Sequence, residues 1–268
     1  RESASRLRLN LLYFNLFILL LSAGLSYWLA RRTLQPIEEM IEAQNRFTAD
    51  ASHELRTPIT AMRTEVEVSL RDEKLDLKSA KELLGSNLEE IGKLEALSNS
   101  LLKLARYDGQ NHLELTDISA REIIMAAFKK VEPQARHKNI DFDFNLADLT
   151  ISVDKSRFQE LLTILMENAV KYSPADTKVT IGTKKTDHHI SITVADQGVG
   201  IKASDLPHVF DRFYRADQSR SKSAGWRKPD GYGLGLSIAK QIVESHHGKI
   251  SAESKIGHGT TFVITLPI

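Results

Sequence analysis

The sequence predicts a multidomain chain in which a transmembrane helix precedes a helical hairpin, which in turn precedes an α/β sandwich. Three observations predict this order. Residues 11–30 are nearly all apolar, residues 47–104 carry two apolar stripes at helical spacing, and from about His112 strand patterns alternate with helix patterns. A chain of 268 residues has room for all three parts.

The first part is the apolar run from Leu11 to Ala30. Its only interruptions are Asn15, Ser22, Gly24 and Ser26. At about 1.5 Å per residue, a helix of this length just crosses a hydrocarbon layer about 30 Å thick. A signal peptide is the rival, but Trp28 and the pair Arg31-Arg32 stand where a small-residue cleavage site would be expected. A buried core helix is the other alternative.

The segments on either side of this apolar run can also be interpreted. Arg1 stands where an initiator Met would be, so we expect a longer natural protein, of which residues 1–10 are a remnant that precedes the apolar run. Residues 31–46 are expected to form a juxtamembrane helical linker. Charge alone does not orient the run, because basic residues on its two sides roughly balance: Arg1, Arg6 and Arg8 against Arg31, Arg32 and Arg46.

The first hairpin helix is predicted from apolar positions that recur every three or four residues. They are Phe47, Ala51, Leu55, Ile59, Met62, Val66 and Leu70. At about 100° per residue, His53 lies about 200° from Ala51 and from Leu55, which turns its imidazole towards solvent. Thr57 is four residues further on and shares that face.

The segment from Ser52 to Pro58 therefore places a nucleophile on an exposed helix face. His53 is the candidate nucleophile and Glu54 the candidate base, although Glu54 is rotated by about 100° from the imidazole. Pro58 offers no N–H to the carbonyl of Glu54, so we expect the helix to bend there. A kinked helix with an ordinary surface histidine is the alternative.

The second hairpin helix follows a charged turn from Arg71 to Asp76. Its apolar stripe consists of Leu84, Leu88, Ile91, Leu94, Leu97, Leu101 and Leu104. Two helices alone would expose both stripes, whereas pairing two chains into a dimeric four-helix bundle would bury them. We expect this hairpin to span residues 47–108 and a hinge to span residues 109–111.

The third part, residues 112–268, mixes both periodicities. Strands are predicted over Phe142–Phe144, Lys178–Thr183, His189–Val194, Lys249–Glu253 and Thr261–Leu266. Helical stripes run through Phe158, Leu161, Leu162, Leu165 and Ala169, and through Leu236, Ile238, Ala239, Ile242 and Val243. This interleaving of helices with a sheet favours an α/β sandwich.

Composition limits the chemistry. The net charge of +1 does not suggest a nucleic-acid partner. The absence of Cys excludes disulfides, thiolate zinc sites and thiol catalysis.

Six sequence boxes in a fixed order carry a family resemblance. They are Ser52–Pro58, Glu167–Tyr172, Asp196–Gly200, Phe210–Arg215, Gly231–Leu236 and Gly257–Phe262. From about Ile37 to the last residue, the chain resembles the membrane sensor histidine kinases of two-component systems. That family combines a HisKA-type dimerisation domain with a catalytic HATPase domain of the Bergerat-type ATP-binding fold. One departure is Ile164, which stands where many members have a second Asn.

The resemblance implies cofactors and binding residues. ATP and Mg²⁺ are the implied cofactors, and Asn168 is the implied metal ligand; magnesium is a hard ion that accepts a neutral amide oxygen. Asp196 is implied to accept a hydrogen bond from the adenine amino group. The other implied nucleotide-binding residues are Lys171, Tyr172, Gly198, Gly200, Gly231, Gly233, Leu234, Gly235, Leu236 and Thr260.

Local physical reasons support several of these positions. Glycines let the backbone approach a nucleotide closely, and the N–H groups that open a helix favour phosphate. Residues 216–230 are polar and lack periodicity, which is typical of a lid over the nucleotide. The resemblance assigns to Arg215 a contact with the terminal phosphate.

The resemblance further implies a bifunctional enzyme. His53 would be autophosphorylated from Mg-ATP with Glu54 accepting a proton, and the phosphoryl group would pass to an Asp of a cognate response regulator. Thr57 resembles the residue that positions water for dephosphorylating the regulator. The implied setting is a homodimer in a bacterial cell membrane with its kinase domains in the cytoplasm, which makes residues 1–10 an extracytoplasmic remnant. An ATP-binding membrane scaffold and an ATPase-type conformational switch, both without His phosphorylation, are the alternatives.

Overall fold

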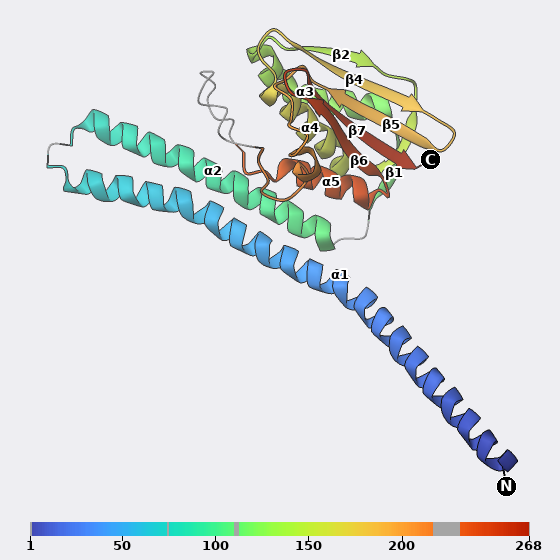
Figure 1. Ribbon diagram of the computed structural model, residues 1–268. Helices are drawn as coiled ribbons and strands as arrows, with labels where there is room; N and C mark the ends of the chain where they lie inside the picture. The colour runs from blue at the N-terminus through green and yellow to red at the C-terminus, as the bar shows by residue number, and fades with distance from the viewer. Residues whose placement is uncertain (1, 74, 110–112, 217–230, 268) are drawn as a thin grey trace. The chain divides into compact units, whose positions relative to one another are not determined.

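The computed structural model describes residues 2–73, 75–109, 113–216 and 231–267 (Figure 1). Most of the expected lid and the expected hinge residues 110 and 111 lie outside this range. The chain divides into two compact units, Arg1–Glu54 and Leu55–Ile268.

Helix α1 spans Glu2–Arg71 and is 70 residues long. It supplies the described part of the first unit and enters the second. Its segment from Asn10 onward is long and apolar enough to cross a membrane, and the side chains of Leu12, Phe17 and Leu20 are each more than 60% exposed. Pro58 lies within α1 and does not end the helix.

Helix α2 spans Leu77–Gly109 and begins after the charged turn that the sequence predicts. At its start, the N–H of Ser79 donates to Asp76 Oδ1 at 2.7 Å, which satisfies one of the unpaired amides at the helix end. Gly109, expected as the first hinge residue, is the last residue of α2. The difference is one residue, as is common at helix ends.

The second unit also contains the α/β sandwich. Its helices are α3 (Ala120–His137), α4 (Lys155–Tyr172), the short 3₁₀ helix η1 (Leu206–His208) and α5 (Gly235–Ser245). Its strands are β1 (Leu115–Ser119), β2 (Asp141–Asn145), β3 (Thr150–Asp154), β4 (Lys178–Lys185), β5 (His189–Ala195), β6 (Lys249–Lys255) and β7 (Gly259–Pro267).

The main sheet has the order β2-β4-β5-β7-β6, and β1 pairs separately with β3. Strand β2 is parallel to β4, and the other neighbours are antiparallel. Alternate residues of β5 (Ile190, Ile192 and Val194) are buried, as are Phe158 and Leu161 of α4. One face of the sheet thus meets the helices, which confirms the predicted α/β sandwich.

All five predicted strands are present, each one to three residues longer than expected. The sequence interpretation missed β1, β3 and α3. The register between β5 and β7 pairs Ala195 with Thr261, which places Asp196 opposite Thr260 just beyond the paired ends. This register brings together two candidate site residues.

Candidate nucleotide and phospho-acceptor sites

His53 lies on α1 and is exposed, as the apolar periodicity predicts. Glu54, the next residue, is half-buried, whereas Thr57 is exposed. The helix is continuous through all three positions. His53 is therefore presented on a regular helix surface that a second macromolecule or domain can approach.

Asp196 directly follows β5 and is 9% exposed. Its Oδ1 accepts hydrogen bonds from the N–H of Gly198 at 2.7 Å and from the N–H of Thr260 at 3.1 Å. Burial raises the pKa of the Asp196 carboxyl, although the two backbone N–H groups act in the opposite direction. Because both bonds go to one oxygen, they fix the direction in which the other oxygen points.

Thr260 lies beside the Asp196 carboxylate. It is 5% exposed, and its Oγ1 lies 3.0 Å from Ser254 Oγ of β6. Ser254 Oγ also accepts from the N–H of Ile201 at 2.8 Å and donates to the carbonyl of Gly259 at 2.8 Å. Sequence reasoning missed Ser254, because a single serine on a strand gives no signal of its partners.

The loop from Asp196 to Gly200 packs on the end of α4. A Cβ on Gly198 would lie 2.7 Å from Asp196 Oδ1 and 2.7 Å from the carbonyl oxygen of Tyr172. The N–H of Val199 donates to the same Tyr172 oxygen at 3.3 Å. Gly198 is therefore required by close approach rather than by an unusual backbone angle.

The last turns of α4 carry three predicted residues. Asn168 and Lys171 are half-buried, and Tyr172 is 41% exposed. The Nζ of Lys171 lies 5.2 Å from the centre of the Tyr172 ring. Burial raises the pKa of Tyr172, while the positive charge of Arg215 lowers it, so Arg215 lies near this ring.

The glycine box before α5 faces the same helix end. A Cβ on Gly231 would lie 2.8 Å from Lys171 Nζ. Gly233 has a φ of +72°, and a Cβ there would be 2.6 Å from the carbonyl oxygen of Tyr214. Only glycine fits this left-handed position without strain.

Helix α5 begins at Gly235, as the glycine box predicts. Leu234 is buried and Leu236 is half-buried. A Cβ on Gly235 would lie 3.3 Å from Ile164 Cγ2. The Ile164 side chain, which stands where many family members have a second Asn, therefore packs against the glycine box. An apolar group takes the place of a second amide here.

These contacts bring together Asp196, Gly198, Thr260, Lys171, Tyr172, Arg215 and the glycine box. Of the expected lid, the structure describes only Ala216, which is exposed.

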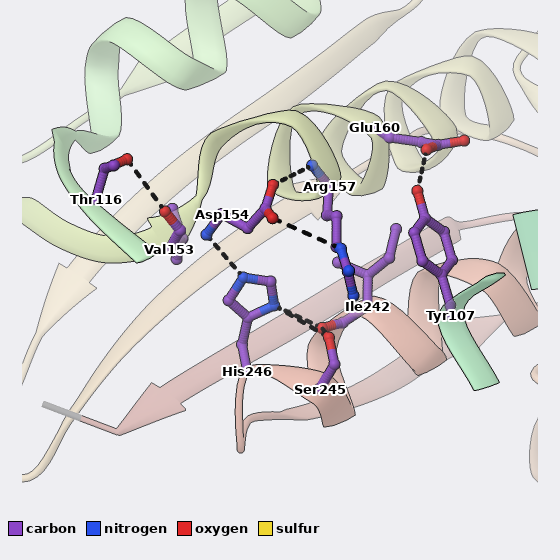
Figure 2. A network of polar contacts seen from close by, with 9 residues as sticks. All are labelled: Tyr107, Thr116, Val153, Asp154, Arg157, Glu160, Ile242, Ser245 and His246. Carbon is purple, nitrogen blue, oxygen red and sulfur yellow. Dashed lines mark hydrogen bonds and ion pairs between the residues drawn. The ribbon is translucent and has the colours of Figure 1, made fainter. Parts of the chain in front are cut away.

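A polar network on the far end of α4 was not predicted (Figure 2). Buried His246 accepts a hydrogen bond at Nε2 from the N–H of Asp154 at 3.0 Å, and its Nδ1 is 2.7 Å from the carbonyl of Ile242. Asp154 Oδ1 in turn accepts from the N–H of Arg157 at 3.0 Å and caps α4. The network thus fixes the first turn of the helix that carries Asn168.

Glu160 of α4 was also missed. Its two carboxylate oxygens lie 2.6 Å from Lys103 Nζ and 2.6 Å from the Tyr107 hydroxyl, both on α2. Arg157 stacks over the Tyr107 ring, with 5.1 Å between the guanidinium carbon and the ring centre. No local pattern indicates such contacts, which join residues more than 50 positions apart.

Two family models match this chain. Residues 43–110 match the His Kinase A (phospho-acceptor) domain, and residues 153–268 match the histidine kinase-, DNA gyrase B- and HSP90-like ATPase family. The first matched segment includes His53, and the second includes the residues around Asp196.

Curated relatives agree with both models. Sensor protein CiaH of Streptococcus pneumoniae serotype 4 is 35% identical over 93% of this chain and 55% of its own length. The signal transduction histidine-protein kinase ArlS of Staphylococcus epidermidis is 36% identical over 87% of this chain and 50% of its own length. The chain therefore spans about half the length of the relatives it matches.

Solved structures share the fold. The histidine kinase ThkA, in complex with response regulator protein TrrA, matches with a TM-score of 0.67 at 24% identity, over 86% of this chain and 63% of that one. The Acinetobacter baumannii histidine kinase AdeS matches with a TM-score of 0.62 at 23% identity, over 80% of this chain and 97% of that one. The two family models and the curated relatives show that the chain belongs to the sensor histidine kinase family of two-component systems.

Proposed function

We propose that this protein autophosphorylates His53 from Mg-ATP and transfers the phosphoryl group to an Asp of a response regulator. The observation that carries the proposal is the buried Asp196 carboxylate, held by two backbone N–H groups beside the α4 and α5 ends, in a chain that also exposes His53 on a phospho-acceptor helix.

Asp196 is proposed to recognise adenine. Its Oδ1 is engaged by Gly198 and Thr260, so the other oxygen is oriented to accept a hydrogen bond from the exocyclic amino group. Guanine carries an oxygen at that position and would offer no donor to the second oxygen of the Asp196 carboxylate. The expected preference is therefore for ATP over GTP.

The phosphates are proposed to lie between α4 and α5. Lys171 next to Gly231, the N–H groups at the start of α5, and Arg215 near Tyr172 together form a positive site. Gly231 fits this role because it lies beside the Lys171 ammonium and its φ of +147° is one that residues with a side chain rarely adopt. Leu234 and Leu236 flank the helix start, and Gly200 and Gly233 shape the adjoining turns.

Asn168 is the proposed protein ligand for Mg²⁺. Its amide oxygen lies on α4 one turn before Lys171, and it is a donor type that magnesium accepts. When bound, the ion would neutralise charge on the phosphate oxygens. Ile164 adds no second amide to this donor set.

In the transfer, an imidazole nitrogen of His53 forms a bond to the γ-phosphorus while the bond to the ADP oxygen breaks. Arg215 is proposed to stabilise the charge on the γ-phosphoryl oxygens. The other imidazole nitrogen loses its proton, and Glu54 is the proposed acceptor. A carboxylate of the regulator then takes the phosphoryl group from His53.

The proposed setting is a homodimer in a bacterial membrane. Ile59 and Val66 on α1 and Leu84, Leu88 and Ile91 on α2 are between 39% and 71% exposed in the single chain. Pairing two hairpins would bury this apolar surface, with the apolar part of α1 in the bilayer and the sandwich in the cytoplasm, where ATP is available.

Labelled ATP tests the acceptor site. The His53→Ala variant should lose acid-labile, alkali-stable label and still bind a fluorescent ATP analogue, whereas Asp196→Asn should lose both. Persistent labelling of His53→Ala would refute the site. Absence of label on the unaltered chain, with nucleotide binding intact, would favour a scaffold.

Thr57 tests the second activity. If Thr57 positions water for regulator dephosphorylation, Thr57→Ala should leave autophosphorylation within about twofold and lower phosphate release from a phosphorylated regulator roughly tenfold or more. The two reactions are measured on the same preparation, and an equal loss of both would contradict a separate role.

A further inference from the structure

The turn after α3 reaches across to the end of α4. There, the ammonium of Lys138 donates hydrogen bonds to three carbonyl oxygens: Val170 at 2.8 Å, Lys171 at 2.9 Å and Ser173 at 3.2 Å. An ammonium has three N–H donors. These three bonds therefore match the full donor capacity of the group.

These bonds complete the end of α4. The last four carbonyls of a helix have no partner within it. Here that of Ala169 accepts from the N–H of Ser173 at 3.2 Å and that of Tyr172 accepts from Val199 at 3.3 Å. The two that remain, Val170 and Lys171, are those that Lys138 satisfies.

The backbone around Lys138 is itself fastened to the turn after α4. The N–H of Asp176 donates to the carbonyl of Lys138 at 3.2 Å, and the side chains of Asn139 and Asp176 are hydrogen-bonded. Both residues have positive φ, +54° and +60°. At the start of β2, the N–H of Asp141 donates to the carbonyl of Thr177 at 3.0 Å. The backbone turn that carries the Lys138 side chain is thus held in place by these hydrogen bonds.

From this arrangement we infer that Lys138 is a positioning residue for nucleotide binding. Its three hydrogen bonds at the end of α4 go to backbone carbonyls. It binds the carbonyls of the helical turn that carries Lys171 and Tyr172. The same turn contacts the loop that follows Asp196, because the Tyr172 carbonyl accepts the N–H of Val199. This inference rests on the proposed nucleotide site.

The positive charge of Lys138 also suits its place. A cation at a helix C-terminus interacts favourably with the helix dipole, and charge-assisted bonds are stronger than neutral ones. Lys138 is half-buried, and this burial lowers its pKa. An apolar side chain at position 138 would leave all three carbonyls without this donor, so that they would need water or the last turn would distort.

The test uses the full chain in detergent micelles, with a fluorescent ATP analogue and labelled ATP. Lys138→Met should weaken analogue binding and raise the KM for ATP about tenfold, equivalent to about 1.4 kcal/mol. The rate of labelling at saturating ATP should stay within about twofold, because the γ-phosphoryl chemistry does not involve Lys138. Lys138→Arg, which keeps charged donors, should recover affinity to within about threefold of the original.

Two controls separate the outcomes. Lys129→Met changes an exposed lysine of α3, the helix that precedes Lys138, and should leave affinity unchanged. If Asp196→Asn binds normally, the proposed nucleotide site itself is wrong. If Asp196→Asn loses binding while folded Lys138→Met keeps full affinity, or if Lys138→Arg is as impaired as Lys138→Met, the positioning role is refuted.

Discussion

The contact between α2 and α4 gives a quantitative prediction. The Tyr107 hydroxyl donates to a Glu160 oxygen at 2.6 Å, a short bond to a charged acceptor. Burial, and secondarily this hydrogen bond, raise the pKa of Tyr107, so its hydroxyl stays a donor throughout the neutral range. A hydrogen bond to a charged group contributes about 1.5–3 kcal/mol. In a cycle of Tyr107→Phe and Glu160→Ala, we expect a coupling energy in that range.

The neighbouring ion pair should contribute less. Lys103 Nζ is also 2.6 Å from Glu160, but the Lys103 side chain is 49% exposed, and pairs of this kind contribute about 0.2–1 kcal/mol. Lys103→Met in a cycle with Glu160→Ala is therefore the matched control. The larger coupling should belong to Tyr107 even though the two distances are equal.

Urea unfolding followed by far-ultraviolet circular dichroism measures both cycles on the full chain in detergent. Each free energy of unfolding comes from a linear extrapolation with a shared slope. A Tyr107–Glu160 coupling below about 0.5 kcal/mol, or a coupling smaller than that of Lys103, would show that burial of the hydroxyl does not strengthen the bond.

Three further predictions concern single positions. Gly198→Ala should lower affinity for an ATP analogue by about tenfold or more, since the new methyl would lie 2.7 Å from Asp196 Oδ1 and from the Tyr172 carbonyl. Isothermal titration measures this affinity, and an unchanged value would contradict the prediction. Burial lowers the pKa of His246, so unfolded chains bind its proton more readily, and stability should fall as pH drops below about 6.5, the unfolded value; His246→Gln should flatten this part of the melting-temperature profile, and an unchanged profile would contradict it. Ser254→Ala should cost about 1–3 kcal/mol in urea unfolding, because the partly buried bonds to Ile201 and Thr260 are lost, and a cost near zero would mean that water replaces them.

Local pattern was sufficient for much of the fold. The alternation in β5 and the stripe in α4 each follow from one segment and one periodicity, so both elements could be predicted from sequence. The same holds for the exposure of His53, which depends only on its angle from the apolar face.

Local sequence pattern could not predict which distant segments pair with one another. Strands β1 and β3 are five residues each and are stabilised by one another across an intervening helix and strand. The Asp196–Thr260 bond joins positions 64 apart, so the two residues were associated only through the family resemblance. Lys138 and Glu160 gave no signal, because a charged residue near a helix end is ordinary until its partners are known.

The two ends of α4 have a consequence for local opening. Asp154 and His246 fix the first turn, and Lys138 and Val199 satisfy the last carbonyls, so neither end is free to fray. Amide protons in the middle of α4 should therefore exchange with deuterium only when the whole sandwich unfolds. Their exchange rates would report the global stability of the domain, and any nucleotide that binds the folded state should slow them all by the same factor.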